Sequence, residues 1–231
     1  MKQIIAIGGG GFGRNPQQSL IEQYILDQAK SNRPNILFIP TATGELDSYI
    51  VNFYKVFSKL QCTPNHLSFF KRTPDLQKLI ADQDVIFVGG GNTKSMLAVW
   101  REWQLDECLR NAYNNGVVMS GVSAGAICWF KHGITDSWES ELKLMPCLEF
   151  VDGVCCPHYD EEPERRPTTK KLLTNNIYQE VIGIEGGCAL HIKDENIFKA
   201  VQFSRKKNSY RVTAKDNKII ESPIESICLV Q

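Results

Sequence analysis

The sequence predicts an α/β fold: a doubly wound, mostly parallel sheet with helices on both faces. Two observations lead to this class. Short apolar segments alternate with longer segments in which apolar residues recur at helical spacing. Three apolar segments also end in glycine-rich or small-residue loops, after Ile7, Val88 and Val122. Because ligands bind outside the carboxyl ends of strands in such sheets, we expect these three loops to converge on one crevice.

In the first half of the chain, apolar runs bounded by glycine or proline predict the strands. We expect them at residues 3–7, 35–39, 65–69, 85–88 and 117–119. The run at 85–88 is apolar at every position, which is typical of a strand covered on both faces. Apolar residues at helical spacing predict the intervening helices, at residues 16–30, 47–60, 74–81 and 94–113.

The pattern becomes less regular beyond Gly133. We expect a strand at 151–155 and then a basic, polar helix that extends to residue 180. Short strands follow, at residues 181–184, 188–192, 198–203, 210–213 and 218–221. Residues 214–217 are typical of a turn, which adds a short antiparallel hairpin near the C-terminus. With no linker, repeat or low-complexity segment between these elements, we expect residues 1–231 to form one domain.

Composition restricts the partners and the location. The chain is 42% hydrophobic and 23% charged with a formal net charge of +0, so charge gives no reason to expect nucleic acid or an anionic membrane as partner. Eight scattered cysteines, one pair of them adjacent, predict free buried thiols in a reducing cytosol. The N-terminal segment is a first strand too short for a signal peptide, and no apolar run approaches the ~18 residues of a membrane span. We expect a cytoplasmic protein.

The segment Gly121-Val122-Ser123-Ala124-Gly125 has the G-x-S-x-G pattern of a nucleophile elbow. It follows an apolar strand and opens a helix, where the tight turn admits only small neighbours. Such a turn exposes the Ser123 hydroxyl above the sheet and directs the free N–H groups of the next helix at the same point. The alternative is that Ser123 is the N-cap of an ordinary buried helix.

A serine nucleophile needs a base, and histidine has a suitable unperturbed pKa. Of the four histidines, His158 alone follows a predicted strand end on the same edge as Ser123, just after Pro157. We expect the other three, His66, His132 and His191, to be structural.

The sequence leaves open which of two carboxylates orients the base. Glu185 ends the predicted strand at 181–184 and is favoured, since that places it at the crevice edge. Asp136, in a polar segment after the elbow, is the alternative. Asp160 is a third choice that we interpret as a loop-capping acid.

Two backbone N–H groups are needed to hold an oxyanion. Ala124, the residue after the nucleophile, offers one. The loop at residues 89–92 offers the other, because its three glycines permit close approach of the backbone. A plain tight turn is the alternative interpretation of that loop.

Three motifs, at residues 86–93, 121–126 and 157–159, together resemble the peptidase E (aspartyl dipeptidase) family of serine peptidases, which includes cyanophycinase-like members. The resemblance extends from Ile4 to about Ile192. It implies a fold similar to class I glutamine amidotransferases, with serine in place of cysteine.

The resemblance also implies roles for individual residues. It implies Ser123 as nucleophile, His158 as base and the amides of Gly91 and Ala124 as oxyanion hole. The family's glutamate lies in a Pro-Glu-Gly-Asn setting, whereas this chain reads Ile184-Glu185-Gly186-Gly187. An N-terminal aspartate of a substrate would need a cation, and the candidate substrate-binding residues are Asn92, Arg165 and Arg166. The two arginines have acidic neighbours in the sequence, so the alternative is that they are solvated.

Other interpretations of the motifs are weaker. Residues 8–13 match the dinucleotide pattern G-x-G-x-x-G, which makes a nucleotide-binding oxidoreductase one alternative, but the second strand ends without the acid that such a site needs. A non-catalytic small-molecule binding protein is the other alternative. The pairs Cys155/His158 and Cys188/His191 do not predict zinc, since side chains three apart in a strand face opposite ways. We expect no metal and no cofactor.

The sequence therefore predicts a serine peptidase that cleaves short peptides through an acyl-enzyme on Ser123, with a dipeptide as the favoured size. The expected partner is a small peptide substrate, and a homodimer is left open.

Overall fold

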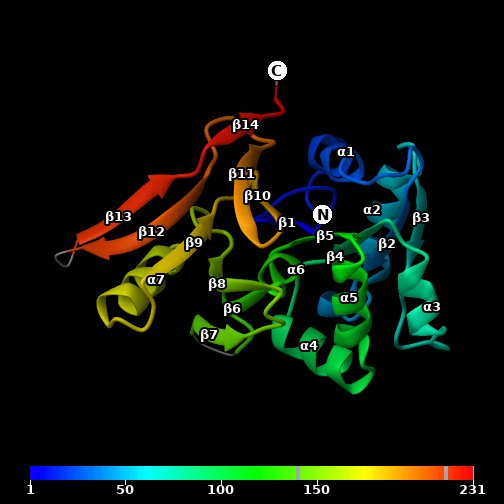
Figure 1. Ribbon diagram of the computed structural model, residues 1–231, viewed down its shortest axis with the longest axis horizontal. Helices are drawn as coiled ribbons and strands as arrows, with labels where there is room; N and C mark the ends of the chain where they lie inside the picture. The colour runs from blue at the N-terminus through cyan, green and yellow to red at the C-terminus, as the bar shows by residue number, and fades with distance from the viewer. Residues whose placement is uncertain (139–140, 216–217, 231) are drawn as a thin grey trace.

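The computed structural model describes residues 1–138, 141–215 and 218–230, which form two sheets with helices packed mainly around the first (Figure 1). The first sheet has eight strands in the order β14-β11-β10-β1-β5-β4-β2-β3. Its strands are β1 (Gln3–Ile7), β2 (Asn35–Ile39), β3 (Thr63–His66), β4 (Val85–Val88), β5 (Val118–Val122), β10 (Cys188–Lys193), β11 (Asn196–Gln202) and β14 (Ser226–Cys228). The strands β1, β5, β4, β2 and β3 are parallel, and β10 extends them by antiparallel pairing with β1.

Helices cover both faces of this sheet, as predicted. Alternate residues of β1 belong to different apolar clusters: Ile5 packs with residues of α1 (Leu20–Leu26) and α2 (Asp47–Phe57). Ile4 packs in the cluster on the other face. That cluster includes residues of α3 (Leu76–Ala81), α4 (Thr93–Glu102), α5 (Leu105–Asn114) and α6 (Ala124–Ile127). The period of two is that of a strand buried on both sides.

Two predicted helices differ from the structure. The one expected at 16–30 is confined to α1, because the chain forms single turns on either side of it: Gln18 N donates to Asn15 O before the helix, and Ala29 N donates to Leu26 O after it. The one expected at 94–113 is divided between α4 and α5, where Gln104 has a left-handed φ of 54°. The strand expected at 65–69 lies slightly earlier, at β3.

Six of the strands that follow the elbow form a second sheet, which the sequence did not predict as separate. Its order is β13-β12-β9-β8-β6-β7. The strands are β6 (Phe130–Thr135), β7 (Lys143–Pro146), β8 (Val151–Cys156), β9 (Glu180–Ile184), β12 (Ser209–Lys215) and β13 (Lys218–Pro223), and α7 (Arg165–Thr174) packs on them. Because β5 already lies between β1 and β4, no later described strand pairs with it. β10, β11 and β14 extend the first sheet beyond β1, and the other six strands pair with one another.

The C-terminal hairpin is confirmed, with β12 antiparallel to β13, and Figure 1 shows it projecting from the body of the molecule. It forms the edge of the second sheet. Of its predicted turn, residues 216–217 lie outside the described residues.

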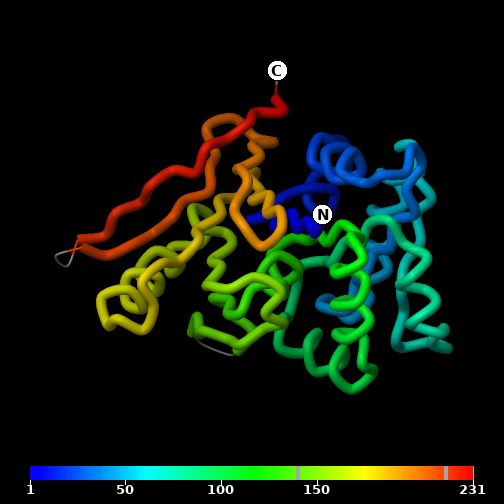
Figure 2. Tube along the Cα trace, in the orientation of Figure 1, coloured from blue at the N-terminus to red at the C-terminus, as the bar shows by residue number. Residues whose placement is uncertain are grey.

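The two sheets share one apolar interior. A single cluster contains Ile4 and Met119 of the first sheet together with Val151 and Ile182 of the second, and the trace in Figure 2 passes between the sheets without an extended connection. That residues 1–231 form one domain stays a prediction. All eight cysteines are free, and five of them are buried. No helix among the described residues is long and apolar enough to cross a membrane.

A buried carboxyl group fixes the loop that follows β1. Glu22, in α1, is 1% exposed and its Oε1 accepts a hydrogen bond of 2.6 Å from Phe12 N. Its Oε2 is buried without a partner among the described residues. Burial raises the pKa of Glu22 to about 7, because the ionised form loses its hydration. The glycine loop is therefore tied to α1 by a group that titrates near neutrality.

We expect Glu22→Gln to change how stability depends on pH. Between about pH 4.5 and 7 the folded protein keeps a proton on Glu22 that the unfolded chain has released, so this group lowers the free energy of unfolding as pH rises. Relative to the natural protein, the variant should gain about 3 kcal/mol between pH 5 and 8. Urea unfolding across that range measures it, with Glu102→Gln on the exposed surface of α4 as control. A stability difference that stays constant with pH would contradict the assignment.

Candidate active site

The elbow predicted at Ser123 is present in the backbone. Ser123 connects β5 to α6 with a φ of 57°, and its amide donates to Ile7 O over 3.0 Å. A side chain at Gly125 would overlap the carbonyl of Val88, so the second glycine of the motif lets α6 pack on the end of β4. Ser123 occupies the N-cap position of α6, but its side chain makes no capping bond to the helix. The strain instead directs the hydroxyl into a cavity.

His158 reaches the same place from the second sheet. It follows β8 in a loop, where its φ of 51° is again left-handed. Its amide donates to Gly8 O over 3.0 Å. Two consecutive carbonyls at the end of β1, those of Ile7 and Gly8, therefore hold the backbones of Ser123 and His158.

The other histidines are structural, as predicted. Each bonds a tyrosine hydroxyl through Nδ1: His66 with Tyr54, His132 with Tyr178, and His191 with Tyr24. Burial lowers the pKa of His191 to about 3, so this ring is neutral in the folded protein.

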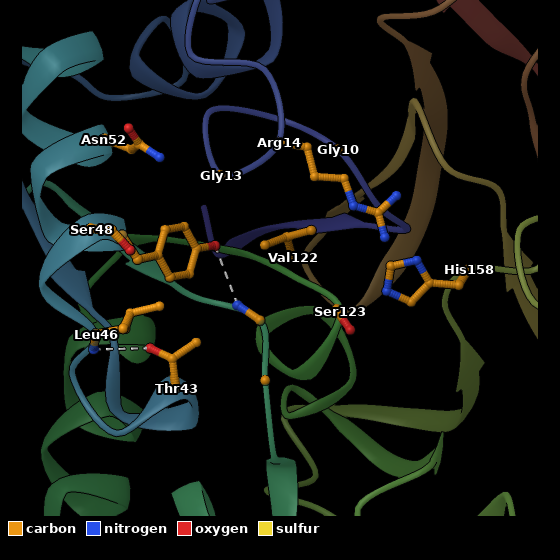
Figure 3. Close-up of a pocket in the computed structure, with 13 residues that line it drawn as sticks. Gly10, Gly13, Arg14, Thr43, Leu46, Ser48, Asn52, Val122, Ser123 and His158 are labelled. Carbon is orange, nitrogen blue, oxygen red and sulfur yellow. Dashed lines mark hydrogen bonds between the residues drawn. The ribbon is translucent and has the colours of Figure 1, made fainter.

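The three predicted loops converge on one cavity of about 350 Å³ (Figure 3). Its lining includes Gly10 and Gly13 after β1, Gly90 and Gly91 after β4, and Ser123 with His158. Residues that the sequence analysis did not assign to the site complete it: Arg14, Thr43, Leu46, Ser48, Tyr49 and Asn52. Most of these belong to the turn after β2 and to α2. Because β2 is a parallel strand that ends at the same sheet edge as β1, β4 and β5, its position in the sequence could have indicated that this turn lies at the site.

Ser123 and His158 share the cavity without being hydrogen-bonded. Among the described residues, the Ser123 hydroxyl has no hydrogen-bond partner, and Figure 3 shows the Nε2 edge of His158 facing the side on which Ser123 lies. Bonds of this kind are often long in unliganded enzymes and shorten when substrate binds.

The predicted oxyanion amides border the serine. Gly91 has a φ of 133°, and a side chain there would overlap the carbonyl of Ala42, which accepts from Asn92 N over 2.8 Å. Within the described ranges, the structure records no hydrogen bond donated by the amide of Gly91 or Ala124. This loop is more constrained than a plain turn, and its geometry fits the predicted role.

The carboxylate beside His158 is Glu161, which the sequence analysis did not assign. Its Oε2 lies 2.6 Å from His158 Nδ1. Glu185, the favoured candidate, instead accepts from Asn208 N over 2.9 Å. Asp136 is 70% exposed, and the structure records Arg165 as its ion-pair neighbour. Asp160 accepts from Gly186 N and pairs with Lys207, a loop-capping role as predicted.

The three predicted substrate-binding residues do not line the cavity. Asn92 caps α4 by accepting from Ser95 N. Arg165 is 2% exposed and is bound by Glu162 and the carbonyl of Ile134. Arg166 stacks on the ring of Tyr159 and pairs with Glu221. Of these partners, Glu162 is one of the acidic sequence neighbours, whereas Ile134 and Glu221 are distant in sequence and gave no signal.

The charged cavity-lining side chain is Arg14, which donates to Glu161 Oε1 over 2.6 Å. The glycines at 8–13 do not open a helix, since α1 begins only at Leu20, so the dinucleotide pattern lacks its structural context. No three His, Cys, Asp or Glu side chains within residues 1–138, 141–215 and 218–230 are placed to hold a metal ion.

Comparison with known proteins relates this chain to peptidases. A model of peptidase family S51 matches residues 4–200. Over 225 residues, 97% of each chain, this protein is 45% identical to an uncharacterized peptidase, YgaJ, of Bacillus subtilis strain 168. Over 180 residues, 72% of each chain, it is 28% identical to a peptidase E of a Nostoc species.

Solved structures share the fold. A crystal structure of a peptidase from an acI-B1 actinobacterium superposes with a TM-score of 0.68 at 18% identity, over 96% of this chain and 95% of that one. A putative peptidase E from Listeria monocytogenes EGD-e gives 0.65 at 20% identity, over 88% of this chain and 100% of that one.

Two glycine substitutions compare the open turn after β2, at Gly44, with the crowded loop after β4, at Gly91. Gly44→Ala meets open space at a φ of 66° and should cost about 1 kcal/mol of unfolding free energy. Gly91→Ala meets a φ of 133°, which alanine tolerates less well than 66°, and also overlaps Ala42 O. It should therefore cost clearly more, with loss of any activity that depends on the Gly91 amide. Urea denaturation midpoints measure both. Equal costs would show that crowding does not fix the loop.

Proposed function

The chain belongs to peptidase family S51, and we propose that it cleaves short peptides through an acyl-enzyme formed on Ser123. It is a serine-type peptidase by family. One observation carries the assignment of residues: Ser123 and His158 face one cavity, with their backbones held by consecutive carbonyls of β1.

In the proposed acylation step, the Ser123 hydroxyl turns toward His158 as the substrate enters. His158 Nε2 takes the hydroxyl proton while Ser123 Oγ attacks the peptide carbonyl carbon. The resulting oxyanion accepts hydrogen bonds from the amides of Gly91 and Ala124, which the folded protein leaves free for it. The intermediate collapses, the C–N bond breaks, and His158 returns the proton to the leaving amine.

Deacylation reverses these roles with water. His158 takes a proton from water as its oxygen attacks the acyl carbon, and the same two amides hold the second oxyanion. The ester bond to Ser123 then breaks, the acid product leaves, and Ser123 Oγ recovers its proton from His158.

The size and charge of the cavity support a dipeptidase with a preference for N-terminal aspartate. About 350 Å³ is at the lower end of ligand pockets, which favours a dipeptide over a long chain. An aspartyl side chain would find Arg14 as its cation, because only one of the guanidinium donors is used by Glu161.

A fluorophosphonate probe tests the nucleophile. We expect covalent labelling at Ser123, located by mass spectrometry, because the elbow presents this hydroxyl to the cavity and His158 lies nearby to take its proton. Ser123→Ala should abolish labelling, whereas Ser95→Ala, at an exposed position of α4, should not. Labelling that is absent, or that survives Ser123→Ala, would refute the acyl-enzyme proposal.

A dipeptide panel tests the preference. We expect kcat/KM for Asp-Leu to exceed that for Ala-Leu, and Arg14→Gln to reduce this ratio about 10-fold to 100-fold by removing a charge-assisted bond. Using the ratio cancels any effect of Arg14 on turnover in general. Arg33→Gln, at an exposed arginine outside the cavity, is the control. A ratio unchanged by Arg14→Gln would mean that this arginine does not recognise the side chain.

A further inference from the structure

We propose that Glu161 is the positioning residue of His158: it fixes the proton on Nδ1 and leaves Nε2 free to receive the serine proton. The inference rests on the proposed function of His158 as base. It assigns to Glu161 a role for which the sequence analysis considered Glu185 and Asp136.

The contact itself determines which nitrogen carries the proton. Glu161 Oε2 lies 2.6 Å from His158 Nδ1, and the His158 side chain is only 8% exposed. An ionised carboxylate can only accept hydrogen bonds, so Nδ1 is the donor and a neutral ring has its lone pair on Nε2. That is the tautomer a general base needs. The imidazolium formed during the reaction would be stabilised by the same carboxylate.

The backbone around the pair is shaped to hold it. Glu161 lies one turn beyond His158, and its amide donates to His158 O over 3.0 Å. A side chain at Gly9 would come within 2.6 Å of Glu161 Oε2 and 2.8 Å of His158 Nδ1, and one at Gly186 would overlap the same carboxylate. Two glycine loops, after β1 and after β9, therefore press against the pair and limit its rotation.

Arg14 restricts the carboxylate further. It donates to Glu161 Oε1, so Oε2 is left for the histidine. Arg14 is 57% exposed and Glu161 31%, so the ion pair adds little to the stability of the fold. Loss of the contacts between Arg14, Glu161 and His158 should therefore change kcat and the tautomer of the His158 ring much more than it changes the free energy of unfolding.

The other carboxylates near the site have different partners. Glu185 receives the amide of Asn208 and lies 3.7 Å from Arg166 Nη2, and Asp136 has Arg165 as its ion-pair neighbour. Glu162, adjacent to Glu161 in sequence, binds Arg165. Among the described residues, Glu161 is thus the one carboxylate in hydrogen-bond contact with His158.

Glu161→Gln tests the role sharply, because Arg14 dictates how the amide would sit. The guanidinium would retain the Gln oxygen, which turns the amide NH₂ toward Nδ1 and forces the proton onto Nε2. We expect kcat on the best dipeptide to fall about 10³-fold to 10⁴-fold, with KM nearly unchanged. Glu161→Asp keeps the charge but withdraws it by one methylene, and should give an intermediate kcat.

Controls and a second readout make the result decisive. Glu164→Gln, at an exposed position just before α7, should behave as the natural protein, and Glu185→Gln and Asp136→Asn test the earlier candidates. Histidine-ring ¹⁵N NMR at alkaline pH, with His158 identified through His158→Gln, should show protonated Nδ1 in the natural protein and protonated Nε2 in Glu161→Gln.

A Glu161→Gln variant with unchanged kcat and unchanged tautomer would overturn the inference, as would a large loss in Glu185→Gln or Asp136→Asn alone. If the natural protein neither hydrolyses dipeptides nor labels at Ser123, the proposed function fails. The NMR comparison still decides whether Glu161 fixes the ring.

Discussion

The geometry of the site depends on the carboxyl end of β1. Two consecutive carbonyls there, of Ile7 and Gly8, each accept a hydrogen bond of 3.0 Å from a residue of the proposed reacting pair, Ser123 after β5 and His158 after β8. The same strand is buried at every position and pairs on both sides, with β5 and β10. Rigid support of this kind is what precise placement of reacting groups requires.

The second sheet explains why that support is needed. The serine comes from β5, but β8, which leads to His158, belongs to a different sheet, so no common strand pairing aligns the two residues. Instead the loops after β1, β8 and β9 bond one another: Gly8 to His158, Gly9 to Gly187, and Gly8 to Cys188. Their small residues permit this close approach, and the charged chain of Arg14, Glu161 and His158 lies over them.

Much of the first sheet could be predicted from the sequence, because its strands are buried on both faces and read as unbroken apolar runs. The strands at 3–7, 35–39 and 85–88 occur at those residues. The half-exposed β7 at 143–146 gives no such run and was missed. Glu161 was missed for another reason: its contact with His158 depends on a left-handed φ at the histidine and on loops distant in sequence, none of which local pattern encodes.

One part of the cavity wall comes from a stretch of chain that contains none of the proposed reacting groups. Thr43, Leu46, Ser48, Tyr49 and Asn52 follow β2 in one short stretch, whereas Ser123, His158 and Glu161 are fixed by other loops. Substitutions in that stretch would therefore change the shape of the cavity without replacing any residue that we propose to act in bond cleavage.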